Sequence, residues 1–188
     1  MKEPDKDFEK IILGIDPGTN ILGYGLIGIN SKKMTLISTG ILKMTKLDNH
    51  QLKLKKIFES ITHLIEEYYP DEVAIEAPFF GKNVQSMLKL GRAQGVAMAA
   101  SLVKDLPIEE YSPRKIKQSI TGNGNASKEQ VAKMIQTLLK LKSIPNELDA
   151  TDGIAVAICH FFQNNLDTTK NYNSWKDFIK NNPKRINR

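Results

Sequence analysis

The chain is poor in the residues that build disulfides and zinc sites. It has one cysteine and three histidines in 188 residues. A single cysteine cannot form an internal disulfide, and Cys159 lies in an apolar run, so we expect a buried thiol and a reducing, cytoplasmic setting. The histidines, at positions 50, 63 and 160, are far apart and lack the spacing of zinc ligands. Long apolar runs are also absent, and we expect neither a membrane span nor a signal peptide.

Alternating strand and helix patterns fill most of the chain. Apolar segments at 10–16, 23–30, 34–44, 72–76 and 108–111 read as strands. Helical spacing marks 47–69, 83–104, 113–120, 127–141 and a last helix from about 145 to 162. The order predicts an α/β fold, in which one five-stranded mixed sheet carries helices on both faces. We expect an extension at 1–9, a domain at 10–162 and a weakly ordered, Asn- and Lys-rich tail at 163–188.

Charge is distributed unevenly. The net charge of +6 is the sum of −2 over residues 1–80, +7 over 81–142, −3 over 143–162 and +4 over 163–188. A basic middle beside isolated acids indicates a polyanionic partner and a cation site. The charge alone is equally compatible with a basic protein whose lysines are merely solvated.

Four acids stand in otherwise apolar segments. Asp16 and Glu76 each end a predicted strand, while Asp149 and Asp152 lie three residues apart on the last helix and so share a face. If the two strands are neighbours, the acids converge where open α/β sheets bind ligands. Carboxylates without Cys or His favour Mg²⁺ or Mn²⁺, and two such ions support in-line attack at phosphorus. Taken singly, Asp16 could cap a turn and Asp149 could favour a helix N-terminus.

Basic and aromatic residues follow the acids along the chain. Phe79 lies on a loop after Glu76 and could stack on an unpaired base, although such a loop could equally close over the core. The basic and polar residues that follow Phe79 along the chain could together bind a row of DNA phosphates, whereas each one alone fits a solvated surface. The DNA-binding candidates are Phe79, Lys82, Asn83, Arg92, Arg114, Lys117 and Lys128.

The apolar helix at 84–100 has two interpretations. It could belong to the core, or it could form a two-fold interface between copies of the chain. The segment Ile15-Asp-Pro-Gly-Thr19 similarly resembles the first phosphate loop of the actin and Hsp70 superfamily. Those proteins need two such domains, and 188 residues hold only one.

These motifs together resemble the RuvC family of Holliday-junction endonucleases. The resemblance covers about residues 11–160 and rests on Ile12-Leu-Gly-Ile-Asp-Pro-Gly18, Gly23-Tyr-Gly25, Ile75-Glu76, Gly81-Lys-Asn83, Leu88-Lys-Leu-Gly-Arg-Ala-Gln-Gly95, Tyr111-Ser-Pro-Arg-Lys-Ile-Lys-Gln118 and Asp149-Ala-Thr-Asp152. It implies an RNase H-like fold, a homodimer, and two Mg²⁺ ions, replaceable by Mn²⁺, in each active site. It also implies paired symmetric nicks with 5′-phosphate ends and cooperation with the RuvA–RuvB branch-migration complex.

By matching motif positions, the resemblance implies roles for individual residues. Asp16, Glu76, Asp149 and Asp152 would bind metal and catalyse the reaction, although some relatives carry His at the position of Asp149. Phe79 would stack on a junction base, and Lys117 and Lys128 would lie near the cleavage site. Residues 1–9 and the tail have no assigned role.

Three alternatives stay open at this point. A non-catalytic junction-binding protein would use the same basic surface, but it would not need all four acids. An ATP-binding domain would need a second phosphate loop. A broad-specificity RNase H-like nuclease would not need the aromatic wedge at Phe79.

Overall fold

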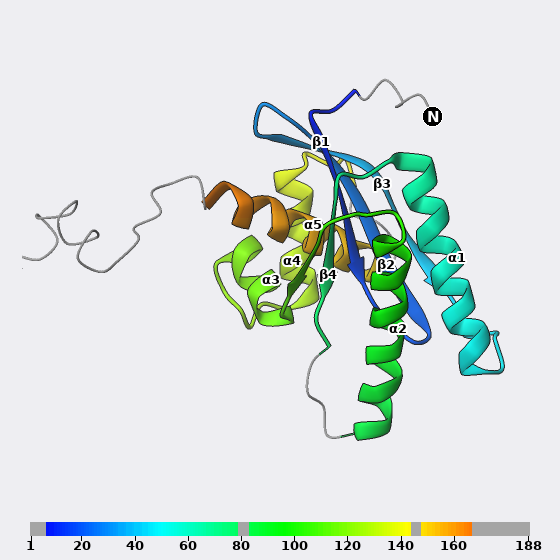
Figure 1. Ribbon diagram of the computed structural model, residues 1–188. Coiled ribbons are helices and arrows are strands. Elements are labelled where there is room, and N and C mark those ends of the chain that lie inside the picture. The colour runs from blue at the N-terminus through cyan, green and yellow to red at the C-terminus, as the bar shows by residue number, and fades with distance from the viewer. Residues whose placement is uncertain (1–6, 79–82, 144–147, 167–188) are drawn as a thin grey trace, which may run out of the picture.

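The computed structural model describes residues 7–78, 83–143 and 148–166. Ten elements follow one another in these ranges (Figure 1): β1 (Lys10–Asp16), β2 (Ile21–Asn30), β3 (Lys33–Lys43), α1 (His50–Tyr68), β4 (Glu72–Glu76), α2 (Val84–Leu102), β5 (Ile108–Tyr111), α3 (Pro113–Thr121), α4 (Lys128–Leu138) and α5 (Leu148–Leu166). The order of strands and helices is the predicted one.

The five strands form one mixed sheet in the order β3-β2-β1-β4-β5. β2 pairs antiparallel with β1 and β3, and β4 pairs parallel with β1 and β5. The short turns after β1 and β2 fit an antiparallel meander, while the helical crossover through α1 brings β4 back parallel to β1. The expected mixed sheet is therefore confirmed, with β1 and β4 as neighbours near its middle.

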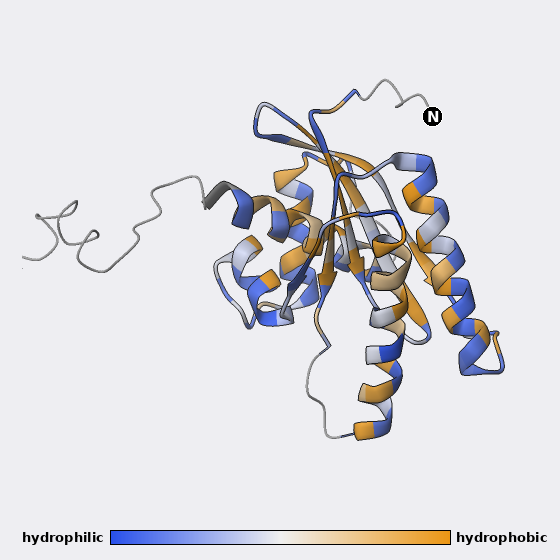
Figure 2. Cartoon of the chain, viewed as in Figure 1, coloured by the Kyte–Doolittle hydropathy of each residue, from blue (hydrophilic) through white to orange (hydrophobic). Residues whose placement is uncertain are grey.

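Helices cover both faces of the sheet (Figure 1). α1 and α2 pack on one face over Leu13, Ile15 and Val73, and α3, α4 and α5 pack on the other face over Ile12 and Ile27. Side chains alternate between the faces because successive residues of a strand point in opposite directions. The strands and the inward sides of the helices are accordingly hydrophobic, and the outer side of α1 is hydrophilic (Figure 2).

Local caps set several helix boundaries. Asn49 accepts a hydrogen bond from the Leu52 backbone, so α1 begins at His50 rather than at the predicted residue 47. Asn83 accepts from the Ser86 backbone in the same way, and α2 starts one residue later than predicted. Ser127 and Gln130 form a reciprocal capping box, which confirms Ser127 as the N-cap of α4.

The last helix differs from its predicted range. α5 begins at Leu148 and extends to Leu166, beyond the predicted end at Phe162. The added turn is held because the Asn164 amide donates to Glu72 Oε2 at the start of β4, at 3.1 Å. The predicted start near residue 145 falls in 144–147, outside the described residues.

Small residues let α5 lie unusually close to the sheet. A β-carbon on Gly14 would overlap the Gly153 carbonyl and Ala157, and one on Gly23 would overlap the Asp149 carbonyl. A β-carbon on Gly153 would in turn overlap the Tyr24 backbone. This close packing through small residues brings the first turns of α5 against the end of β1 and the start of β2.

Two composition-based expectations can be compared with the structure. Cys159 is fully buried in α5, as predicted. No helix within the described ranges is long and apolar enough to cross a membrane.

Candidate active site

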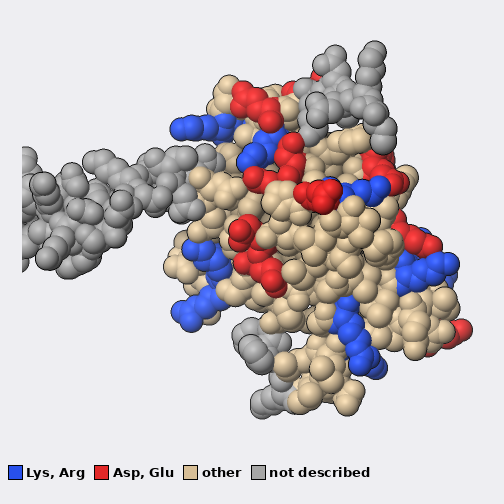
Figure 3. Space-filling view, viewed as in Figure 1, with Lys and Arg blue, Asp and Glu red and all other residues tan. Residues whose placement is uncertain are grey.

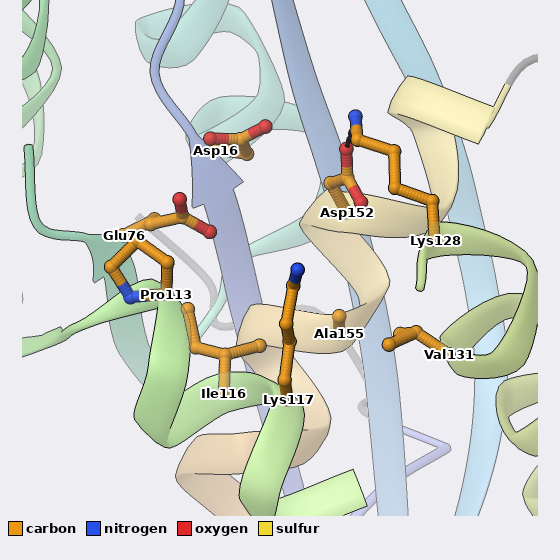
Figure 4. Close-up of a pocket in the computed structure, with 9 residues that line it drawn as sticks. All are labelled: Asp16, Glu76, Pro113, Ile116, Lys117, Lys128, Val131, Asp152 and Ala155. Carbon is orange, nitrogen blue, oxygen red and sulfur yellow. Dashed lines mark hydrogen bonds and ion pairs between the residues drawn. The ribbon is translucent and has the colours of Figure 1, made fainter. Parts of the chain in front are cut away.

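Two carboxylates lie side by side where β1 and β4 end. Asp16 is the last residue of β1 and Glu76 the last of β4, and the parallel register pairs Ile15 with Ile75 just before them. Their side chains face one pocket on the α5 side of the sheet (Figure 4). The convergence expected from the two strand ends is therefore present.

These two carboxyl groups hold their protons unusually well. Burial, followed by the charge of Asp152, raises the pKa of Asp16 to about 7. Burial and the neighbouring Asp16 raise the pKa of Glu76 to about 8. The charges of nearby lysines lower these pKa values only in part, so a bound cation would further stabilise the charged form of both acids.

Asp149 and Asp152 come to the site from the first turns of α5. Asp152 lines the pocket with Asp16 and Glu76, and its side chain is 17% exposed. Asp149 is more open, with 43% of its side chain exposed. The Lys128 ammonium joins the two, at 2.6 Å from Asp152 Oδ2 and 3.1 Å from Asp149 Oδ1.

Helices α3 and α4 close the remaining sides of the pocket. Its volume is about 200 Å³, and Lys117 of α3 points into it between Glu76 and Asp152 (Figure 4). The other lining residues are Pro113, Ile116, Val131 and Ala155. The pocket therefore combines three carboxylates with two amines on a partly apolar floor, a composition suited to a phosphate group and cations.

The donor set fits a hard divalent cation. All four acids offer oxygen ligands, which Mg²⁺ and Mn²⁺ prefer. In the arrangement described for residues 7–78, 83–143 and 148–166, however, no three His, Cys, Asp or Glu side chains are grouped closely enough to hold a metal ion. The Lys128 ammonium instead occupies oxygens of two of the acids.

The remaining predicted DNA-binding residues are spread over the surrounding surface. Arg114 lies beside Gly124 in the loop before α4. Arg92 of α2 is exposed near the start of α1, where its charge helps to lower the pKa of His50, after the larger effect of burial. Asn83 caps α2. Phe79 and Lys82 lie outside the described residues.

Basic side chains project from two places near the strand ends. In Figure 3 they extend from the α3 side of the molecule and from the lower half of α2. The pocket lies between these helices, because α3 lines it directly and α2 lies beyond Glu76. A polyanion crossing the pocket would thus meet positive charge on both sides.

Sequence patterns missed two features of the site. Gln94 of α2 is buried and lines a second, smaller pocket with Asp16, Glu76 and Leu90. Its amide donates to Glu110 Oε2 at 2.6 Å. The available signal in the sequence was a glutamine within the otherwise apolar end of the Leu88–Gly95 motif. The second feature is the double ion pair of Lys128, a residue predicted only to contact DNA.

Fold and site together define an α/β nuclease domain of the RNase H-like type. The mixed sheet, the acids at the ends of β1 and β4 and the acids on the crossing helix α5 are the features that support this class. Residues 12–160 match the family described as crossover junction endodeoxyribonuclease RuvC. The chain belongs to the RuvC family.

Individual relatives agree with this assignment. The RuvC of Christiangramia forsetii is 60% identical over 179 residues, which cover 95% of this chain and 93% of that protein. The RuvC of Cytophaga hutchinsonii is 58% identical and covers 98% of this chain and 92% of its own. The structure of Thermus thermophilus RuvC in complex with a Holliday junction substrate matches with a TM-score of 0.79 at 28% identity, covering 85% of this chain and 98% of that one.

Proposed function

We propose that this protein resolves Holliday junctions by hydrolysing phosphodiester bonds at the pocket formed by Asp16, Glu76 and Asp152. The convergence of these acids at the ends of β1 and β4, beside Lys117 and Lys128, carries the proposal. Membership of a family of crossover junction endonucleases, and the likeness to a relative in complex with a junction, support the choice of substrate.

Asp16, Glu76, Asp149 and Asp152 would hold divalent metal, with two Mg²⁺ ions per site and Mn²⁺ as a substitute. When bound, such ions supply an activated water and stabilise the leaving 3′ oxygen, which leaves a 5′-phosphate on the product. The protein's own part is to hold the acids in place through the β1–β4 register and the close packing of α5. Lys117 would bind the phosphate that enters the pocket.

The surrounding basic residues would position the DNA backbone. Arg114, Lys117 and Lys128 lie on the α3–α4 side, and Arg92 and Asn83 lie on α2. Contacts of this kind are electrostatic and fix the register of the duplex arms rather than their sequence. Phe79 would stack on a base at the branch point, and Lys82 would contact the backbone beside it.

A homodimer would match the two-fold symmetry of the junction and produce paired symmetric nicks. Along α2, Val84 and Leu88 are 63% and 51% exposed, and Gly91 and Gly95 have open space where a side chain would lie. These positions share one helical face, and the hydrophobic start of α2 lies clear of the sheet (Figure 2). We place the two-fold contact there, with Leu88→Lys expected to shift the mass in light scattering from dimer to monomer.

We further propose that the protein cooperates with the RuvA–RuvB complex and acts in the cytoplasm, and membership of the RuvC family supports this proposal. Coupling is testable by asking whether the RuvA–RuvB pair changes the rate of junction cutting.

The substrate is tested with a labelled synthetic four-way junction and a linear duplex of the same sequence, both in Mg²⁺. Wild type and Asp16→Asn are run in parallel, with binding measured in Ca²⁺. We expect symmetric nicks in the junction alone, and a mutant that binds but does not cut. Tight binding without cutting, over many sequences and also in Mn²⁺, would instead support a junction-binding protein without nuclease activity.

A further inference from the structure

Lys128 makes the closest charged contacts in the site. Its ammonium lies 2.6 Å from Asp152 Oδ2 and 3.1 Å from Asp149 Oδ1, so one cation holds two carboxylates. Although burial lowers it, the hydrogen bond and charge of Asp152 hold the pKa of Lys128 above its usual range. The ammonium is therefore the positive charge that balances the α5 acids while no metal is bound.

The capping box of α4 fixes the backbone of Lys128, and the side chain reaches from α4 to the acids on α5. Lys128 is the first residue of α4, directly after Ser127, whose backbone N–H donates to Gln130 Oε1 at 2.9 Å in the capping box. A positive charge in the first turn of a helix opposes the helix dipole, so helix formation does not explain a lysine here. The contact that does explain it is the pair of acids on α5.

The ammonium and a divalent ion compete for these carboxylates, because two cations held by the same acids repel each other. With Lys128 in place, no three acids within the described ranges are grouped to hold a metal. Lys128 also lines the pocket that a phosphate would enter, and about half of its side chain is exposed. It can therefore reach either the acids or an incoming phosphate.

We propose that Lys128 is the resident counter-ion of the metal-free site and exchanges Asp149 and Asp152 for a DNA phosphate when the junction binds. The exchange frees the two acids for metal, so DNA and metal bind cooperatively. This inference rests on the proposed metal site at the four acids. Because linkage is reciprocal, metal must also strengthen junction binding by the same factor.

Two other lysines provide matched controls. Lys117 lines the same pocket, but in the described part of the chain it makes no ion pair with any of the four acids. Lys133 is exposed on α4, away from the pocket lining. Loss of Lys117, which removes a charge from the same pocket but no ion pair, should weaken DNA binding and raise metal affinity less than loss of Lys128 does. Loss of Lys133 should change neither.

The first arm of the test measures Mn²⁺ binding to the full-length, DNA-free protein by electron paramagnetic resonance. Wild type is compared with Lys128→Met, Lys117→Met and Lys133→Met. We expect Lys128→Met to bind Mn²⁺ about 10-fold more tightly than wild type, within the range of ordinary coupling. Lys133→Met should match wild type, and Lys117→Met should gain clearly less than Lys128→Met. Lys128→Gln serves as a second variant, and thermal unfolding establishes that each is folded.

The second arm measures junction affinity by fluorescence anisotropy with and without Ca²⁺, which supports binding without cutting. Ca²⁺ should tighten junction binding by wild type several-fold more than by Lys128→Met. Equal Mn²⁺ affinities for wild type and both Lys128 variants, with binding lost in Asp152→Asn, would overturn the exchange and leave the metal site intact. If no variant binds Mn²⁺ with or without junction, the proposed metal site itself fails.

Discussion

Strand β4 carries a glutamate at each end, on the same face of the sheet, and the surroundings of the two side chains differ. At the start, Glu72 accepts hydrogen bonds from Lys10 at 2.7 Å and from Asn164 at 3.1 Å, and contacts His160 at 2.9 Å. At the end, Glu76 faces Asp16 and Asp152 across a pocket. Glu72 is held by hydrogen-bond partners, whereas Glu76 faces two other carboxylates and makes no ion pair in the described part of the chain.

The pKa shifts follow from these surroundings. Burial raises the pKa of Glu72, but hydrogen bonds from Lys10 and His160 outweigh it and hold the pKa below its usual value. For Glu76, burial and Asp16 act in the same direction and raise the pKa to about 8. A satisfied network stabilises the fold, whereas a cluster of unsatisfied acids is retained for a task that needs a cation.

Exchanging each glutamate for glutamine should separate the two roles most clearly in activity. Glu76→Gln removes a proposed metal ligand, and we expect junction cutting to fall by about 1000-fold, comparable to the loss of a major transition-state contact. Glu72→Gln should cut within about 3-fold of wild type per folded molecule, because Glu72 lies at the other end of β4 and does not line the pocket. A 3-fold change is less than about 1 kcal/mol in the barrier. Single-turnover cleavage of a four-way junction measures both rates. Similar losses in the two variants would contradict the different roles assigned to Glu72 and Glu76.

Stability should respond in the opposite sense. Glu72→Gln disrupts the contacts with Lys10 and His160, and we expect it to lower the free energy of unfolding by about 1–2 kcal/mol. Glu76→Gln removes a carboxylate that repels its neighbours, so the metal-free protein should be as stable as wild type or more stable. Urea denaturation at pH 8 with a chelator gives both values, and a destabilised Glu76→Gln would contradict this interpretation.

The metal-free protein should lose stability as the pH rises. Asp16 and Glu76 have pKa values of about 7 and about 8 in the folded protein, above their ordinary 3.8 and 4.5. Between about pH 4 and pH 8 the folded state therefore binds more protons than the unfolded state, and the free energy of unfolding falls across this range.

We expect the Tm with a chelator to be about 5 °C lower at pH 8.5 than at pH 5, as for a change of about 2 kcal/mol in a domain of this size. The drop should shrink in the double variant Asp16→Asn, Glu76→Gln. An unchanged drop in that variant would assign the pH dependence to other groups.

The smallest expected effect concerns Lys10. Lys10 forms an ion pair with Glu72, and 39% of the Lys10 side chain is exposed to solvent. We therefore expect Lys10→Met to change the free energy of unfolding by less than about 1 kcal/mol. Because His160 and Asn164 still contact Glu72, the network should survive. A loss as large as that of Glu72→Gln would show that Lys10 dominates the network.

Local patterns predicted the order of strands and helices along the chain and placed Asp16 and Glu76 at strand ends. Their meeting was expected only if the two strands were neighbours, and the sheet order satisfies that condition. Each acid ended an apolar strand, and the helical crossover required β1 and β4 to run parallel.

Contacts between distant side chains could not be predicted from such patterns. His160 and Glu72 are 88 positions apart, and no periodicity relates them. The pairing of Lys128 with Asp152 depends on where the loop between α3 and α4 places the start of α4, and local sequence does not fix that position. Gln94 was likewise hidden, because a buried amide on an apolar helix gives no sign of its partner.

The most direct test of the account is the effect of Mg²⁺ on thermal unfolding of wild type, Glu76→Gln and Glu72→Gln at pH 8. A ligand that binds only the folded state raises the Tm, and the rise grows with the logarithm of the ligand concentration relative to its Kd. We predict that Mg²⁺ raises the Tm of wild type and of Glu72→Gln by the same amount and has little effect on Glu76→Gln. A full Mg²⁺ shift in Glu76→Gln would contradict the placement of the metal at this end of β4.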